Sequence, residues 1–256
     1  MEKYMYCAII KNGKIIDGSG AEPFYADVAI KDGKIVKIGS ISGQAKTVID
    51  AEGLTVTPGF IDSHSHADNE VFTLSAMKEK VEQGITTAIA GQCGGSAAPL
   101  SIAHDKNDQT MLGKYGKRYD IQKTMDSFLE YGSRVALGCN IAMFIGHGSV
   151  RLSVMGMENR APTGSELEKM KSAVRSALKS GAFGMSTGLY YAPGSYADTD
   201  EVIELAKVVK EEGGVLSSHI RAESDPVLDA ADEFLKIVKA SGVRGVHSYV
   251  HGFEVG

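Results

Sequence analysis

The sequence predicts an α/β protein of the (β/α)8 TIM-type barrel class, preceded by a small N-terminal β-sandwich portion. Three observations support this prediction. From residue 58 onward, short apolar segments alternate with amphipathic helical segments; polar residues recur where the apolar segments end; and residues 1–57 contain only short strands and tight turns. Parallel strands need crossover connections, so strand–helix alternation is typical of a parallel sheet. Polar residues after several different strands are typical of a barrel, which builds its site at the carboxyl ends of its strands.

Residues 1–57 predict the β-sandwich portion. The dipeptides Asn12-Gly13 and Asp32-Gly33 each lie between apolar runs. Each predicts a β-hairpin, because both positions of such a turn tolerate a positive φ. We therefore place the domain boundary after residue 57 and assign residues 58–256 to the barrel.

Six strands are predicted in the barrel portion, at 59–62, 86–91, 141–145, 183–187, 215–218 and 245–249. Amphipathic helices are predicted at 165–179, 200–212 and 226–240, the first beginning with a capping box at Ser165. The polar region 100–120 is predicted to be a long loop over the strand ends. A closed barrel needs eight strands, so we expect this barrel to be incomplete at the C-terminus.

Composition excludes several classes of protein. Of the 256 residues, 43% are hydrophobic and 23% are charged, as in a globular domain. The net charge of −5, without a basic stripe, argues against a nucleic-acid partner. No apolar run approaches the ~20 residues of a membrane span, and the N-terminus lacks a signal peptide, so we expect a cytoplasmic protein without a membrane partner. Three scattered cysteines fit a reducing compartment. The sequence leaves the oligomeric state open.

Four residues at predicted strand ends are candidate metal ligands. His64 and His66 follow the first barrel strand at a spacing of two, which places both imidazoles on one face. Cys93 lies in a glycine-bounded turn after the second strand, and His219 ends the fifth. Each candidate also has an interpretation without a metal. His64 and His66 would then be surface histidines, Cys93 a small buried residue and His219 a core histidine. Neutral imidazole and thiolate together suit zinc.

Other histidines are less informative. His147 follows the third strand, and it either contacts a substrate or anchors a loop. His247 and His251 lie near the last predicted strand, and either one is a candidate for a further ligand.

These motifs resemble the amidohydrolase superfamily, and specifically the D-aminoacylase (N-acyl-D-amino-acid deacylase) family. The segment 57–66, Thr-Pro-Gly-Phe-Ile-Asp-Ser-His-Ser-His, is similar to a motif found across much of the superfamily. Segments 9–20, 91–94 and 187–197 resemble the deacylase branch more narrowly. The resemblance extends to about residue 245.

The resemblance implies zinc-dependent hydrolysis of the amide bond of N-acyl-D-amino acids, with one or two zinc ions. It implies that Cys93 and His219 hold the tighter zinc, that His64 and His66 form a second position, and that Tyr191 lies near the substrate carboxylate. Hydantoinase relatives bridge two metals with a lysine after the fourth strand, and segment 182–189 contains no lysine.

The sequence also departs from this family. The family's general-base aspartate follows the eighth strand and has no counterpart here, so no catalytic residue is assigned. We expect the 256-residue chain to be C-terminally truncated relative to the family and to associate through exposed sheet edges. The alternatives are an inactive remnant that binds metal, or an amidohydrolase for another amide, such as a cyclic imide, lactam or dipeptide.

Overall fold

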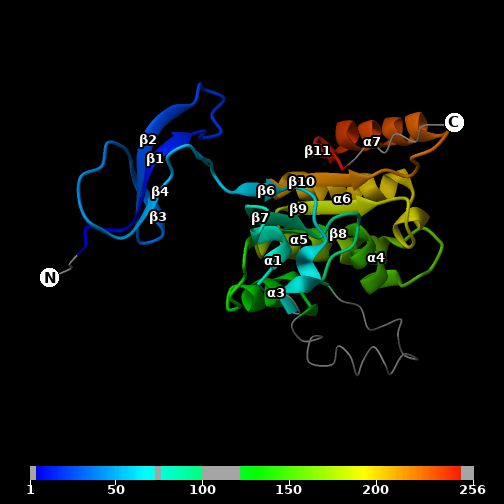
Figure 1. Ribbon diagram of the computed structural model, residues 1–256. Coiled ribbons are helices and arrows are strands. Elements are labelled where there is room, and N and C mark those ends of the chain that lie inside the picture. The colour runs from blue at the N-terminus through cyan, green and yellow to red at the C-terminus, as the bar shows by residue number, and fades with distance from the viewer. Residues whose placement is uncertain (1–3, 73–75, 100–121, 249–256) are drawn as a thin grey trace. The chain divides into compact units, whose positions relative to one another are not determined.

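The computed structural model of the protein describes residues 4–72, 76–99 and 122–248. The chain divides into two compact units, Met1–Phe60 and Ile61–Gly256 (Figure 1). The predicted long loop at 100–120 lies outside the described residues. Among the helices that are described, none is long and apolar enough to cross a membrane.

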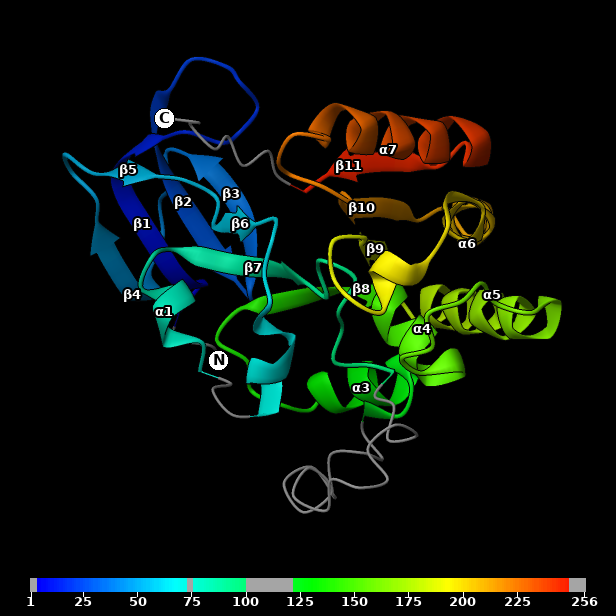
Figure 2. The same ribbon diagram turned by 90° about the vertical axis from the view of Figure 1, so that its right-hand side faces the viewer.

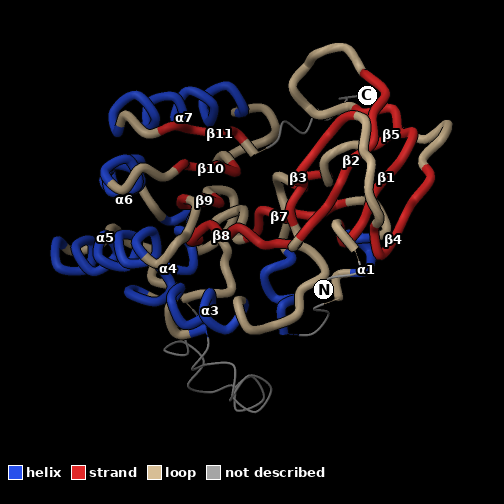
Figure 3. Tube along the Cα trace, turned by 90° about the vertical axis from the view of Figure 1, so that its left-hand side faces the viewer, coloured by secondary structure: helices blue, strands red, loops and turns tan. Residues whose placement is uncertain are grey.

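The first unit contains one five-stranded sheet (Figure 3). Its strands run in the order β3-β2-β1-β4, and β5 also pairs with β1. β1 is antiparallel to β2 and parallel to β4 and β5. Ile9, Ala29 and Ile41 form a small core. The five strands are β1 (Tyr6–Ile15), β2 (Phe24–Lys31), β3 (Lys34–Gly39), β4 (Ala45–Asp50) and β5 (Thr55–Val56).

The two predicted hairpins have different outcomes. Asp32-Gly33 joins β2 to β3 with φ angles of 50° and 71°, so this hairpin prediction is confirmed. The Asn12-Gly13 prediction is wrong: this dipeptide lies inside β1, where the register with β2 shifts between Ile10 and Gly13. Asn12 has a φ of 60°, and its N–H donates to Asp27 Oδ1 at 3.1 Å. A positive φ here produces a bulge in a continuing strand instead of a chain reversal.

A second sheet, in the order β11-β10-β9-β8-β7-β6, curls as about half of a barrel in the Ile61–Gly256 unit (Figure 2). All pairings from β7 to β11 are parallel. All six strands predicted from the sequence are present, with ends shifted by a residue or two. They are β6 (Phe60–Asp62), β7 (Ile85–Ala90), β8 (Asn140–Gly146), β9 (Gly184–Gly188), β10 (Val215–His219) and β11 (Arg244–His247).

Helices cover the outer face of this sheet. The three predicted helices correspond to α5 (Gly164–Lys179), α6 (Thr199–Glu211) and α7 (Val227–Ser241). The other helices are η1 (Ala67–Phe72), α1 (Lys78–Val81), α3 (Met125–Gly132), α4 (His147–Met155) and η2 (Gly194–Tyr196). The apolar faces of α5 and α6 join buried sheet residues in one core, which includes Met170, Val174, Leu205, Met185 and Leu216.

The capping box of α5 lies two residues before its predicted position. Thr163, and not Ser165, is the N-cap: its hydroxyl accepts from Glu166 N–H at 3.3 Å. The Glu166 carboxylate in turn accepts from Thr163 N–H at 2.7 Å. Thr163 takes the cap because its backbone is extended there, with φ −68° and ψ 161°.

Candidate metal centre

The segment after β6 carries His64 and His66. Ser65, between them, is buried and donates its backbone N–H to Ile89 O of β7 at 2.9 Å. The segment therefore still lies alongside β7 beyond the last strand residue. The two imidazole rings lie on the same side, with centroids 5.5 Å apart. This is the alternation that the spacing of two predicts.

The turn after β7 brings Cys93 to these histidines. Cys93 has a φ of 54°, and its neighbours Gly91 and Gly94 have φ angles of 74° and 73°. A Cβ on Gly94 would lie 2.5 Å from Gly188 N, so only glycine fits between this turn and the end of β9. The turn is fixed further by Gly94 N–H, which donates to Ser186 Oγ at 3.0 Å.

His64, His66 and Cys93 form a compact donor cluster, which we call the ligand cluster. One ligand atom from each of the three residues lies within 4.8 Å of the others. Cys93 Sγ lies 3.3 Å from His64 Nε2. Burial lowers the pKa of His64, and the neighbouring imidazoles of His66 and His219 lower it further. His64 is therefore neutral near pH 7, as a metal ligand must be, and two imidazoles with a thiol fit zinc by donor type.

His219 is a fourth donor that contacts Cys93. It is the last residue of β10, it is buried, and its Nδ1 lies 3.6 Å from Cys93 Sγ. Its other ring nitrogen, Nε2, lies 3.0 Å from Glu223 Oε1. Cys93 Sγ thus lies within 3.6 Å of a ring nitrogen of both His64 and His219, so these donors can hold one or two ions.

Tyr191 lies beside this cluster. Its ring centroid is 4.9 Å from that of His219, and the side chain is partly open to solvent. Burial raises the pKa of the Tyr191 phenol, and the neighbouring Cys93 and Glu223 raise it further. The phenol is therefore a hydrogen-bond donor near pH 7.

A cavity of about 490 Å³ opens at the cluster and is lined by His66, Cys93, Asp68, Ser149 and Tyr191, among others. Asp68 is buried, and its Oδ2 accepts from Ala97 N–H at 2.6 Å. Burial raises the pKa of this carboxyl group. The cavity therefore has polar walls with the ligand cluster on one side.

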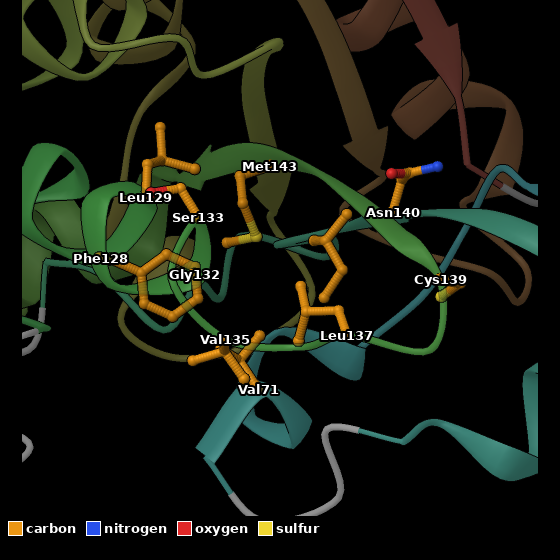
Figure 4. Close-up of a pocket in the computed structure, with 11 residues that line it drawn as sticks. Val71, Phe128, Leu129, Gly132, Ser133, Val135, Leu137, Cys139, Asn140 and Met143 are labelled. Atoms are coloured by element: carbon orange, nitrogen blue, oxygen red, sulfur yellow. The ribbon is translucent and has the colours of Figure 1, made fainter. Parts of the chain in front are cut away.

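A different cavity, of about 420 Å³, lies between α3 and β8 (Figure 4). It is lined by apolar side chains such as Phe128 and Met143 and by the polar residues Ser133 and Asn140. No residue of the ligand cluster lines it, and we do not assign the site there.

The structure places His147 apart from the ligand cluster. His147 begins α4 and is fully buried, with Nε2 2.9 Å from Glu201 Oε1. Glu201 also accepts from Arg151 Nε at 3.2 Å. His147 does not line the 490 Å³ cavity. This geometry corresponds to the anchoring role that the sequence left open as the alternative to substrate contact.

His247 points away from the site. It pairs with Ser218 in the parallel register of β10 and β11, and paired residues share a face. Ser217 and His219, on either side of Ser218, face the site: Ser217 Oγ donates to Gln92 Oε1 at 2.8 Å. His247 therefore faces the helical layer, where its ring centroid lies 5.9 Å from that of Phe234 of α7. His251 lies outside the described residues.

Three residues at the site were not singled out from the sequence: Asp68, Gln92 and Glu223. Gln92 is buried and spans the sheet, since its Nε2 also donates to Ser63 O at 3.2 Å. Each lies within four positions of a predicted ligand, and this proximity is the only sequence signal that could have indicated them.

Comparisons with known proteins agree with this geometry. The profile described as "Amidohydrolase family" matches residues 47–250. The D-aminoacylase of Alcaligenes xylosoxydans xylosoxydans is 35% identical over 242 residues, which cover 94% of this chain and 50% of the relative. The chain spans about half the length of the curated relatives it matches.

Solved structures show the same relationship. The N-acyl-D-glutamate deacylase of Bordetella bronchiseptica, complexed with zinc and a phosphonate inhibitor, matches with a TM-score of 0.86 and 36% identity over 94% of this chain and 50% of that one. A D-aminoacylase described as having a binuclear metal center matches with a TM-score of 0.84 and 34% identity over 94% of this chain and 51% of that one. The fold, the strand-end cluster and the profile match over most of the chain lead to one conclusion: the chain belongs to the amidohydrolase family.

Proposed function

We propose that the protein takes part in the zinc-dependent hydrolysis of the amide bond of N-acyl-D-amino acids, releasing a carboxylate and a D-amino acid. The observation that carries this proposal is the ligand cluster, with His219 Nδ1 3.6 Å from Cys93 Sγ. The D-aminoacylase and N-acyl-D-glutamate deacylase relatives support the substrate class.

Cys93 and His219 would hold one zinc ion, and His64 and His66 would hold a second, weaker position. Bound zinc supplies Lewis-acid polarisation of a carbonyl group and lowers the pKa of water. Gln92 and Ser217 hold the strand ends in place behind these ligands, because their side chains bond to each other at 2.8 Å. The ligands are therefore positioned by the sheet before any substrate arrives.

Tyr191 is the substrate-binding residue in this proposal. Its phenol keeps its proton near neutral pH, so it can donate to the carboxylate of an N-acyl amino acid. Tyr191 lines the cavity together with His66 and Cys93, so a carboxylate bound there would leave the amide near the ligand cluster.

The deciding experiment measures release of free amino acid from N-acetyl-D-methionine and N-acetyl-D-glutamate by the purified, zinc-loaded protein. The L-enantiomers and the metal-stripped protein are the controls. Release from the D-substrates alone, restored by zinc, supports the proposal. Tight zinc binding without release from either substrate overturns it in favour of a chain that binds metal without turnover.

A further inference from the structure

The side chain of Ser186 lies against the turn that carries Cys93, although that turn follows β7, two strands away in the sheet. Ser186 is the middle residue of β9 and is fully buried. It pairs with Gly146 of β8 in the parallel register, and paired residues share a face of the sheet. A Cβ on Gly146 would lie 2.5 Å from Gly94 O, so the turn after β7 lies against this same face.

The Ser186 hydroxyl bonds to both ends of this turn. It donates to Gly91 O at 2.5 Å and accepts from Gly94 N–H at 3.0 Å. One hydroxyl can do both, because it has one proton and two lone pairs. Between these two contacts Cys93 has a φ of 54°, a conformation that residues other than glycine rarely adopt. Such a conformation persists only where the surrounding structure holds it.

We propose that Ser186 is a positioning residue that fixes the Cys93 turn, residues 91–94, so that the thiol stays within reach of both His64 and His219. This inference rests on the proposed function, because it treats Cys93 as a metal ligand. Cys93 Sγ lies 3.3 Å from His64 Nε2 and 3.6 Å from His219 Nδ1. The two histidines are placed by β6 and β10, so the position of the thiol between them depends on the conformation of the turn.

The physical reason lies in the backbone groups that Ser186 binds. Gly91 and Gly94 are both buried, so water does not replace a partner that they lose. Removal of the hydroxyl favours another conformation of the turn, in which Gly91 O and Gly94 N–H find new partners. Metal–ligand distances tolerate a change of only about 0.2 Å, so a small shift of the turn weakens binding. Outer-shell partners of metal ligands typically contribute about 10–100-fold to metal affinity.

The test compares Ser186→Ala with Thr187→Val as the matched control. Thr187 is the next residue of β9, its side chain lies on the opposite face, and its hydroxyl donates to Ser218 Oγ at 2.8 Å. Both variants lose one buried hydroxyl without a large change in volume, and both should lower the urea midpoint. Only Ser186→Ala should weaken zinc binding, by about 10–100-fold in chelator competition, and shift the sulfur-to-metal band of the cobalt(II) protein.

Two further measurements need no metal. Gly94 N–H should be protected from hydrogen exchange in the wild-type protein, which tests its bond to Ser186 even if Ser186→Ala does not fold. The Cys93 thiol should react faster with iodoacetamide in folded Ser186→Ala than in the wild type, with the labelled site identified by mass spectrometry.

The inference is overturned by an unprotected Gly94 N–H, or by wild-type zinc affinity and an unshifted cobalt band in folded Ser186→Ala. An equal loss of zinc affinity in Thr187→Val would reduce the effect to general destabilisation and would overturn it as well. If the wild-type protein binds no zinc, the metal site of the proposed function fails. The exchange of Gly94 N–H and the alkylation of Cys93 then decide whether Ser186 holds the turn.

Discussion

Cys93 Sγ lies 3.3 Å from His64 Nε2, although the two residues are 29 positions apart in the chain. The contact exists because β6 and β7 are neighbours in the sheet and the chain leaves both strands at the same edge. It joins the thiol to the two histidines whose spacing identifies the site.

The first prediction concerns the thiol. Cobalt(II) added to the metal-free protein should give a sulfur-to-metal charge-transfer band, which Cys93→Ala should abolish because the sulfur is removed from the ligand cluster. Cys7→Ser is the control, because Cys7 is exposed on β1 in the other unit. An undiminished band in Cys93→Ala would show that Cys93 is only a packing residue.

The second prediction compares two histidines at strand ends. His64→Ala should weaken zinc binding by at least the roughly 10–100-fold that loss of an outer-shell partner costs, because it removes a direct ligand. His247→Ala should leave zinc affinity unchanged, because its ring faces Phe234 and the helical layer. Chelator competition measures both, and circular dichroism checks that each variant keeps its secondary structure. Equal loss in the two variants would contradict the assignment of faces in β11.

The third prediction concerns substrate binding. Tyr191→Phe should raise KM by about 10-fold or more with little change in kcat, because a hydrogen bond to a charged group is lost equally in ground state and transition state. Tyr131→Phe is the matched control, because Tyr131 stacks on Phe72 away from the cluster. Steady-state kinetics with N-acetyl-D-methionine provide the measurement. Wild-type KM in Tyr191→Phe would remove this residue from the site.

The fourth prediction concerns the turn that carries Cys93. Gly94→Ala should destabilise the fold by about 1–3 kcal/mol and weaken zinc binding as well, because Gly94 has a φ of 73° and the new Cβ would lie 2.5 Å from Gly188 N. Gly164→Ala should be tolerated, since no atom lies within 4 Å of a Cβ at that position. Urea denaturation with and without zinc separates the two effects. A Gly94→Ala protein as stable as Gly164→Ala would show that the turn adapts freely.

The fifth prediction concerns the start of α5. Thr163→Ala should cost about 1 kcal/mol of stability, because Glu166 N–H loses its acceptor. Arg160 and the Thr163 N–H hold the pKa of Glu166 well below its ordinary value. This carboxylate therefore stabilises the fold above the ordinary pKa, and its contribution is lost as the pH falls through the lowered one. Glu166→Gln should show a smaller loss of stability on acidification than the wild type, as followed by thermal unfolding at stepped pH.

Much of the barrel portion could be predicted from the sequence, because local rules decide it. Alternating strands and helices fixed the element order, and the spacing of two put His64 and His66 on one side. The capping box and the N-terminal turn show the limit of these rules. Thr163 and Ser165 are both acceptable caps, and the extended backbone at Thr163 decides between them. Asn12-Gly13 suits a bulge as well as a hairpin, and only the pairing of β1 with β2 decides between these two.

Other parts of the site depend on contacts that no local pattern reveals. In the sequence, His147 cannot be distinguished from the other histidines at strand ends. Its side chain is buried against Glu201, which is 54 positions away in the chain. The side of the sheet on which the His247 side chain lies depends on its pairing with Ser218. The sequence of β11 alone does not determine this pairing. The position of Glu223 depends on the irregular segment after β10, in which Arg221 bonds to Glu233 and to Ser195 O of the loop after Tyr191.

The backbone of Gly188 contacts both Cys93 and Tyr191. A Cβ on Gly188 would lie 2.0 Å from Cys93 O, and Gly188 O accepts from Tyr191 N–H at 3.2 Å. The backbone of Gly188, to which Tyr191 N–H is bonded, is therefore in direct contact with the backbone of Cys93, and no side chain lies between them. A movement of the Tyr191 backbone on ligand binding would therefore reach the peptide unit of Cys93, and we expect such a movement to change the spectrum of a metal ion held by Cys93.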